Sequence, residues 1–202
     1  MPTTPRNFDW LIAQIGVSPA QRRFSRSLLL TPDDLGDGWA IHSDRSWPVG
    51  GMVRWRSGGT DASRRARKAK CVTAWRDFEC ASLKRWTWIQ VAPLYSEEDA
   101  ASYATRIEKQ FVPNPRNPSA TPQLVGPIEV EGLSGTRAWE STSSTVEYPR
   151  GLAWMVAGFV DRVVILQHCS WDGDSWSRDG ANSAVTLQAA KVRSLLEHFS
   201  KM

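Results

Sequence analysis

Residues 151–170, GLAWMVAGFVDRVVILQHCS, contain two apolar segments on either side of a short polar step. The segments Leu152–Phe159 and Arg162–Ser170 are rich in valine and leucine and have the length of strands, so each predicts a β-strand. Because little chain separates them, the two strands are expected to pair antiparallel. Two earlier segments, Pro127–Leu133 and Thr136–Ser143, show the same strand signals. The last third of the chain therefore predicts an antiparallel meander.

Helical signals flank this meander on both sides. Ser96-Glu97-Glu98-Asp99 approximates a capping box, and apolar residues at helical spacing follow it, which predicts a helix over about 96–111. A second amphipathic helix is predicted over about 183–200, with an apolar face formed by Val185, Ala189, Val192, Leu196 and Phe199. We therefore expect an α+β fold in which these two helices flank a twisted antiparallel sheet.

The first half of the chain adds further elements to the expected sheet. Apolar and polar side chains alternate from Trp39 to Trp47, as in a half-exposed strand. Thr31-Pro32-Asp33-Asp34-Leu35-Gly36 has an N-cap residue, a proline at the first helical position and a terminal glycine, so it predicts a one-turn helix. Further strands are expected at Met52–Arg56, Cys71–Cys80 and Lys84–Ala92. The predicted organisation is a helical N-terminal segment, 1–30, and a single α+β domain, 31–202, with a basic loop at 57–70.

Composition and length bound the class of protein. The chain has 202 residues and a mass of 22.6 kDa, which fits one domain. No apolar stretch approaches the roughly 20 residues that cross a bilayer, and the N-terminus lacks a charged segment followed by an apolar one. We therefore expect no membrane span and a cytoplasmic protein. Cys71, Cys80 and Cys169 fit no zinc spacing and are expected to be free thiols, and no motif indicates a metal or a cofactor.

Positive charge is concentrated in one segment of the chain. Between Met52 and Lys70, seven cations accompany a single acid, Asp61, so this segment carries a charge of +6 and the rest of the chain, whose total is +4, carries −2. Flanking glycines and the lack of apolar periodicity favour a solvated loop. The alternative is contact with nucleic acid, in which the cations neutralise phosphates and an indole stacks on a base. The candidate nucleic-acid-binding residues are Arg54, Trp55, Arg56, Arg64, Arg65, Arg67, Lys68 and Lys70.

Eleven tryptophans are distributed along the chain from Trp10 to Trp176. Neighbouring residues of a strand face opposite ways, so the adjacent Arg–Trp pairs of this sequence cannot stack on one another. Six tryptophans of the predicted sheet can instead lie on one sheet face, beneath the two helices. They form either solid core or the lining of a cavity for an apolar or aromatic ligand. This candidate ligand-binding set is Trp39, Trp47, Trp86, Trp88, Trp139 and Trp154.

Residues 28–39, LLLTPDDLGDGW, resemble the opening of actinobacterial sensor-type domains, including the extracellular domain of a mycobacterial Ser/Thr kinase. In that group a segment of this form precedes the first strand, and the later order of strand, helix, meander and helix is also similar. The resemblance implies an α+β sensing or ligand-binding module rather than an enzyme. The chain departs from the group because it has no export signal and has three cysteines where those domains carry pairs.

Signatures of catalysis are weak in this sequence. His168 and Cys169 are adjacent on a predicted strand and point to opposite faces, so they cannot form a Cys–His dyad. His42-Ser43-Asp44 has the residue types of a catalytic triad, but contiguity on a strand prevents the required geometry. No catalytic residue is therefore assigned. We expect a non-catalytic module that binds an unknown small molecule or protein partner; the alternatives are a nucleic-acid-associated protein and an enzyme with a dispersed site.

Overall fold

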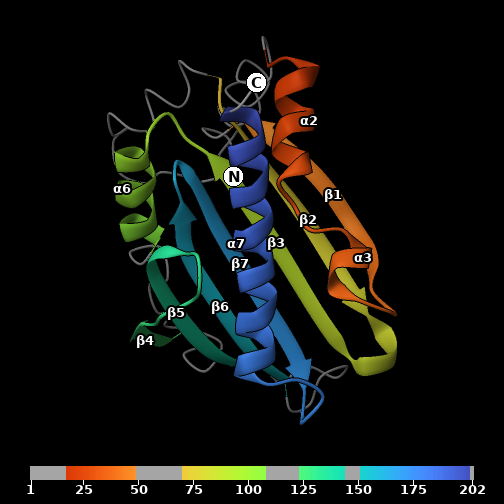
Figure 1. Ribbon diagram of the computed structural model, residues 1–202. Helices are drawn as coiled ribbons and strands as arrows, with labels where there is room; N and C mark the ends of the chain where they lie inside the picture. Colours follow the sequence, from red (N-terminus) through yellow and green to blue (C-terminus); the bar gives the residue numbers. More distant parts are fainter. Residues whose placement is uncertain (1–16, 49–69, 108–122, 144–150, 201–202) are drawn as a thin grey trace, which may run out of the picture.

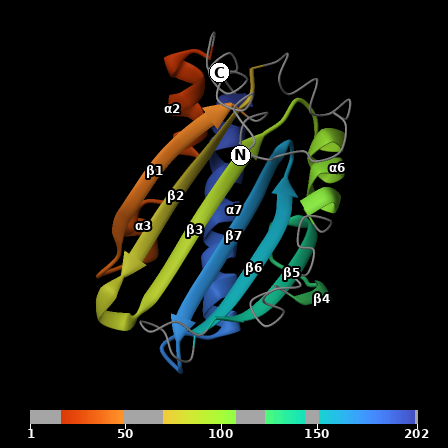
Figure 2. The same ribbon diagram turned by 180° about the vertical axis from the view of Figure 1, so that it is seen from behind.

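The computed structural model describes residues 17–48, 70–107, 123–143 and 151–200. Within these ranges, seven strands form one antiparallel sheet in the order β1-β2-β3-β7-β6-β5-β4 (Figures 1 and 2). The strands are β1 Ala40–Pro48, β2 Val72–Cys80, β3 Arg85–Pro93, β4 Gln123–Pro127, β5 Ser134–Ser143, β6 Gly151–Val160 and β7 Val163–Asp172. The α-helices are α2 Pro19–Ser27, α3 Pro32–Leu35, α6 Glu97–Ile107 and α7 Arg178–Ser200, and a 3-10 turn, Ala81–Leu83, joins β2 to β3.

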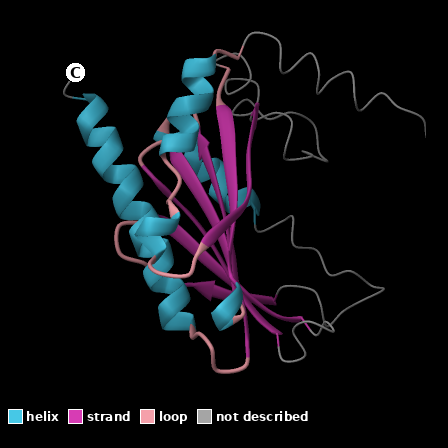
Figure 3. Cartoon of the chain, turned by 90° about the vertical axis from the view of Figure 1, so that its right-hand side faces the viewer, coloured by secondary structure: helices cyan, strands magenta, loops and turns pink. Residues whose placement is uncertain are grey.

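The helices cover the two faces of the sheet unequally. Helix α7 runs along one face together with α2 and α3, whereas α6 lies on the opposite face beside β5 and β6 (Figures 1 and 3). Seen from behind, no described helix lies over β1, β2 and β3 (Figure 2). We call the two sides of the sheet the α7 face and the α6 face. This arrangement is the α+β class that the sequence predicts.

The β6–β7 hairpin forms the centre of the sheet. The two strands pair along their whole length and are joined by Asp161 and Arg162. Asp161 has a φ of +50°, the left-handed conformation that two-residue hairpin turns require. Helices pack on both faces of this hairpin, so nearly every residue of β6 is buried. That double burial explains why the sequence here is an almost continuous apolar run instead of an alternating one.

Two apolar cores result, one on each face of the sheet. On the α7 face, the apolar side of α7 packs with the segment after α2, and the largest buried side chains include Leu28, Leu29, Leu30, Phe78 and Ile165. On the α6 face, a smaller core joins α6 to β5, β6 and β7 through Tyr103, Ile107, Trp139, Met155 and Phe159. Helix α6 therefore covers the α6 face over β5, β6 and β7.

Gln188 of helix α7 forms hydrogen bonds with the segment after α2, residues 28–30. Its side-chain amide donates to the carbonyl of Leu28 at 2.6 Å, and its side-chain oxygen accepts from the N–H of Leu30 at 3.0 Å. Gln188 and the two backbone groups are buried. Because residues 28–30 lie between two helices and outside the sheet, this side chain supplies hydrogen bonds that their buried backbone would otherwise lack.

The C-terminal meander and both flanking helices are confirmed, with shifted bounds. Helix α7 begins at Arg178, earlier than the predicted start near residue 183. Ser177 explains the earlier start, because its hydroxyl accepts from the N–H of Gly180 at 3.1 Å and so satisfies one of the free donors at the helix end. None of the helices in the described ranges is long and apolar enough to cross a bilayer.

One strand prediction is wrong. The sequence predicts a strand at Pro127–Leu133, whereas β4 ends at Pro127 and only an isolated bridge joins Val130 to Leu133. Gly132, with a φ of +78°, adopts a conformation that favours glycine and lets the chain reverse before β5. The predicted strand Met52–Arg56 and the basic loop lie outside the described residues, except for Lys70. The division into 1–30 and 31–202 stays a prediction.

Candidate functional site

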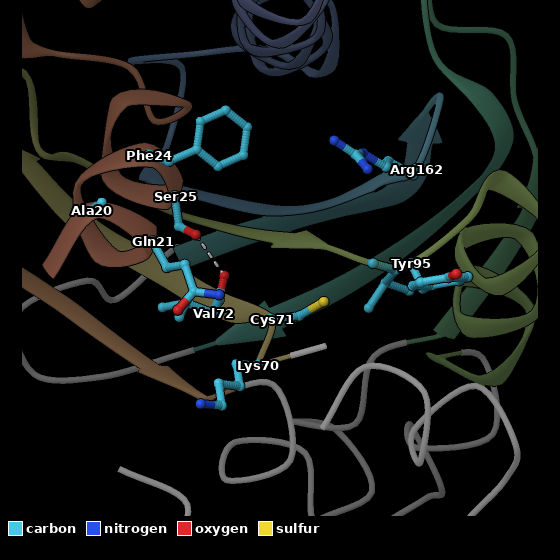
Figure 4. Close-up of a pocket in the computed structure, with 10 residues that line it drawn as sticks. Ala20, Gln21, Phe24, Ser25, Lys70, Cys71, Val72, Tyr95 and Arg162 are labelled. Carbon is cyan, nitrogen blue, oxygen red and sulfur yellow. Dashed lines mark hydrogen bonds between the residues drawn. The ribbon is translucent and has the colours of Figure 1, made fainter. Parts of the chain in front are cut away.

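A cleft opens at one end of the sheet, between α2, the start of β2, the segment after β3 and the β6–β7 turn (Figure 4). It has two adjoining lobes that share Phe24, Tyr95 and Arg162. The first lobe has a volume of about 430 Å³ and is further lined by Ala20, Gln21, Ser25, Lys70, Cys71, Val72 and Leu94. The second lobe has a volume of about 580 Å³ and is further lined by Ser96, Glu97, Asp161 and Leu196. Each is large enough for a small organic molecule.

Helix α2 positions Phe24 at the cleft. The helix begins after a capping box, in which the hydroxyl of Ser18 and the side chain of Gln21 each accept a backbone hydrogen bond, at 3.1 Å and 2.9 Å. Ser25 is buried, and its hydroxyl donates to the carbonyl of Val72 at 2.8 Å, which holds α2 against the start of β2. The ring of Phe24 packs partly on the α7-face core and partly lines the cleft.

The β6–β7 turn positions Arg162 on the opposite wall. The carbonyl of Arg162 accepts from the N–H of Leu94 at 2.8 Å, which ties the turn to the segment after β3. Tyr95 follows directly and is 62% exposed, so an aromatic ring stands at the rim. In Figure 4 the guanidinium group of Arg162 extends into the cleft toward Phe24. The cleft thus combines two aromatic rings with one cation between its lobes.

The described lining of the first lobe has two cationic side chains and no carboxylate. Lys70 and Arg162 are the charged side chains among its described lining residues. Within the part of the chain that the structure describes, neither uses its charged group in a hydrogen bond or an ion pair. By contrast, Arg76 and Arg178 bond to carboxylates of Asp44 and Glu140 at 2.7 Å and 2.5 Å. Among the described residues, no carboxylate bonds to either cation of the first lobe.

The thiol of Cys71, which lines the first lobe, is not activated for nucleophilic attack. Burial raises the pKa of Cys71, the charge of Asp99 adds to the rise, and the charge of Arg162 opposes it. A thiol with a raised pKa stays protonated at neutral pH, and the protonated form is a weak nucleophile. Cys80 and Cys169 are buried free thiols elsewhere in the fold.

The six tryptophans of the predicted ligand-binding set do not share one face of the sheet, so that part of the prediction is wrong. Trp154 belongs to the α7-face core, and Trp39 packs against it. Trp139 belongs to the α6-face core, where Trp88 packs against it. The strand register explains why the two rings lie on different faces. Trp139 on β5 pairs with Met155 on β6 and shares its face, so Trp154, the residue before Met155, lies on the opposite face. Among the five whose side chains the structure describes, all but Trp47, none lines either lobe, and ligand contact by this set stays a prediction.

Trp88 is the middle ring of an aromatic stack on the α6 face. Trp75 stacks on it with ring centroids 4.3 Å apart, and His168 stacks on its other side at 5.5 Å. Trp86 meets His168 edge-on at 5.4 Å. Both faces of Trp88 are therefore covered by neighbouring rings and are closed to a flat ligand. Trp47, the remaining member of the set, lies on the edge strand β1.

The position of His168 in this stack predicts a loss of stability in acid. Burial lowers the pKa of His168 from 6.5 to about 4, and its Nδ1 atom is buried without a hydrogen-bond partner among the described residues. Below pH 6.5 the unfolded chain takes up a proton that the folded chain does not. The free energy of unfolding should therefore fall from about pH 6.5 toward about pH 4, with a slope of at most about 1.4 kcal/mol per pH unit from this group.

Urea denaturation of the protein and of His168→Gln across this pH range measures that contribution. The glutamine variant keeps a polar side chain but does not titrate, so its stability should fall less steeply. Equal slopes for the two proteins would show that His168 is protonated in the folded state as readily as in the unfolded chain.

The candidate nucleic-acid residues lie outside the described residues, apart from Lys70. Lys70 has a φ of +55° and lines the first lobe of the cleft. Nucleic-acid contact by the other members, Arg54, Trp55, Arg56, Arg64, Arg65, Arg67 and Lys68, stays a prediction.

Sequence reasoning missed Phe24, Tyr95 and Arg162 as a group. Each lies in a different part of the chain, and only the pairing of strands brings them together. A weak signal was present at Asp161-Arg162, because a two-residue hairpin turn usually contains glycine or asparagine and this one contains a bulky cation.

Comparison with known proteins supports the fold. No protein-family model matches the chain, and no curated protein matches it. Among solved structures, it is similar to the extracellular domain of PknH from Mycobacterium tuberculosis, with a TM-score of 0.55 and 11% identity over 89% of this chain and 100% of that chain. It is also similar to an uncharacterized protein of Mycobacterium smegmatis, the Rv0999 ortholog, with a TM-score of 0.40 and 9% identity over 89% of this chain and 98% of that chain. The resemblance seen at residues 28–39 is thus confirmed at the level of the fold.

The expected cytoplasmic location is corrected by the same comparison. The fold is that of a domain that lies outside the cell in PknH. A cytoplasmic location, which was inferred from the lack of an export signal, therefore does not follow for this chain.

Proposed function

We propose that the protein is a non-catalytic binding module and that the cleft between α2 and the β6–β7 turn is its ligand site. The observation that carries the proposal is the two-lobed cleft, with Phe24 and Tyr95 on its walls. A half-exposed aromatic pair at a concave site favours an apolar or aromatic small molecule, because such a ligand covers both rings when it binds.

The chemistry of the lining supports binding without catalysis. The raised pKa of Cys71 keeps its thiol protonated, and no histidine lines either lobe among the described residues. The described lining of the first lobe, where Cys71 lies, contains no carboxylate or imidazole that could act as its general base. The fold shared with the extracellular domain of PknH also supports a binding role over an enzymatic one.

The proposal predicts that N-phenyl-1-naphthylamine, a neutral fluorescent probe, binds in the cleft. Tyr95→Ser should weaken its binding about tenfold, since the ring contributes apolar contact at the rim. Phe24→Leu, which removes the aromatic ring on the other wall but keeps apolar packing on the core, should also weaken it. Fluorescence titration of the full chain measures both effects.

A matched control keeps this test specific. Ile41 is 44% exposed on β1 and lines neither lobe, so Ile41→Ser should leave the affinity within about twofold. The proposal fails if the probe does not bind, or if Ile41→Ser weakens binding as much as Tyr95→Ser does.

A further inference from the structure

We infer that the ligand of this cleft is an amphipathic anion, whose oxyanion group lies in the first lobe against Arg162 while its apolar body lies between Phe24 and Tyr95. The inference rests on the proposed function and adds the chemical class of the ligand. It follows from how charge is distributed around the cleft.

The guanidinium group of Arg162 is the main anion contact. It extends into the cleft toward Phe24 (Figure 4) and makes no hydrogen bond or ion pair with the described residues. Its backbone is fixed, because the carbonyl of the same residue accepts from the N–H of Leu94 at 2.8 Å. A guanidinium group presents paired N–H donors that match a carboxylate, sulfonate or phosphate group. The charge and the ring of Phe24 therefore face the same bound molecule.

The two lobes differ in charge, which orients the ligand. The first lobe has Lys70 and Arg162 and no acidic side chain among its described lining residues. The second lobe has Glu97 and Asp161 beside the shared Arg162. An anionic group is attracted to the first lobe and repelled by the carboxylates of the second. The uncharged part of the ligand then extends past Tyr95 toward Leu196.

Two probes that share one fluorophore test this charge preference. 8-Anilinonaphthalene-1-sulfonate carries a sulfonate group, and N-phenyl-1-naphthylamine is the same ring system without it. The full-length protein should bind the sulfonate probe about tenfold more tightly than the neutral probe, and added salt should reduce the difference because it screens exposed charges. Inorganic phosphate at millimolar concentration should not displace the sulfonate probe, because phosphate has no apolar body.

Variants that remove one positive charge test which side chain contacts the sulfonate group. Arg162→Gln should weaken the sulfonate probe about tenfold and leave the neutral probe within twofold, and adding Lys70→Gln should weaken the sulfonate probe further. Arg23 is an exposed arginine of α2 that lines neither lobe, so Arg23→Gln is the matched control and should change neither affinity. Unchanged binding of the neutral probe also shows that each variant is folded.

The outcomes separate this inference from the proposed function. Equal affinities for the two probes, or equal losses for both in Arg162→Gln, would overturn the anionic ligand while leaving an apolar cleft. Displacement by inorganic phosphate would overturn the amphipathic ligand in favour of a simple anion. Failure of both probes to bind would overturn the proposed function itself.

Discussion

Replacing Trp139 with alanine is expected to lower the free energy of unfolding by about 3–5 kcal/mol. The side chain is 1% exposed and belongs to the core between α6 and the sheet. Its removal takes away apolar contact and leaves a cavity that paired strands cannot close without distorting their hydrogen bonds. Urea denaturation at neutral pH, followed by circular dichroism, measures the loss.

Trp86→Ala is the matched control for this prediction. Trp86 is on the same face of the sheet but is partly exposed, and its described ring contact is the edge-on one with His168. Its replacement should cost about 1 kcal/mol, because less apolar area leaves water on folding. Equal losses of stability in the two variants would contradict the burial of Trp139 beneath α6.

Gln188→Leu is expected to lower the free energy of unfolding by about 2–6 kcal/mol. Leucine keeps the size of the side chain but cannot donate to the carbonyl of Leu28 or accept from the N–H of Leu30. Two buried backbone groups then lack partners, and each unsatisfied group costs about 1–3 kcal/mol. The measurement is the shift of the urea midpoint at constant slope, which isolates a change in stability.

The neighbouring residue supplies the control for Gln188. Leu187 is 47% exposed on the same helix, so Leu187→Gln should change stability by no more than about 0.5 kcal/mol. A loss of that small size in Gln188→Leu would mean that water satisfies the two backbone groups and that residues 28–30 are not fastened by α7.

Local patterns in the sequence were sufficient to predict most elements of the fold. The one-turn helix after Thr31 is present, and the backbone N–H of Thr31 donates to the carboxylate of Asp34 at 2.6 Å, as in a capping box. The hairpin around Asp161 and both flanking helices also follow the pattern. Such signals act over a few residues, so they are visible in a single sequence.

Strand prediction failed where a turn competed with an apolar pattern. The apolar residues Ile128 and Val130 resemble a strand, but Gly132 reverses the chain and β5 begins only at Ser134. The facing of the tryptophans was also beyond local reasoning. A register one residue different would exchange the faces of Trp139 and Trp154, and no local pattern fixes that register.

The amino-acid sequence thus contains the class of fold, the order of its elements and the likeness to sensor-type domains. The cleft is a product of long-range packing. Phe24, Tyr95 and Arg162 are far apart in the chain and meet because β3 pairs with β7 while α2 is held on β2 by Ser25. Hydrophobic periodicity specifies which side of an element is buried, but it does not specify which distant element lies beside it. The arrangement of a cation between two aromatic walls therefore becomes visible only in the folded chain.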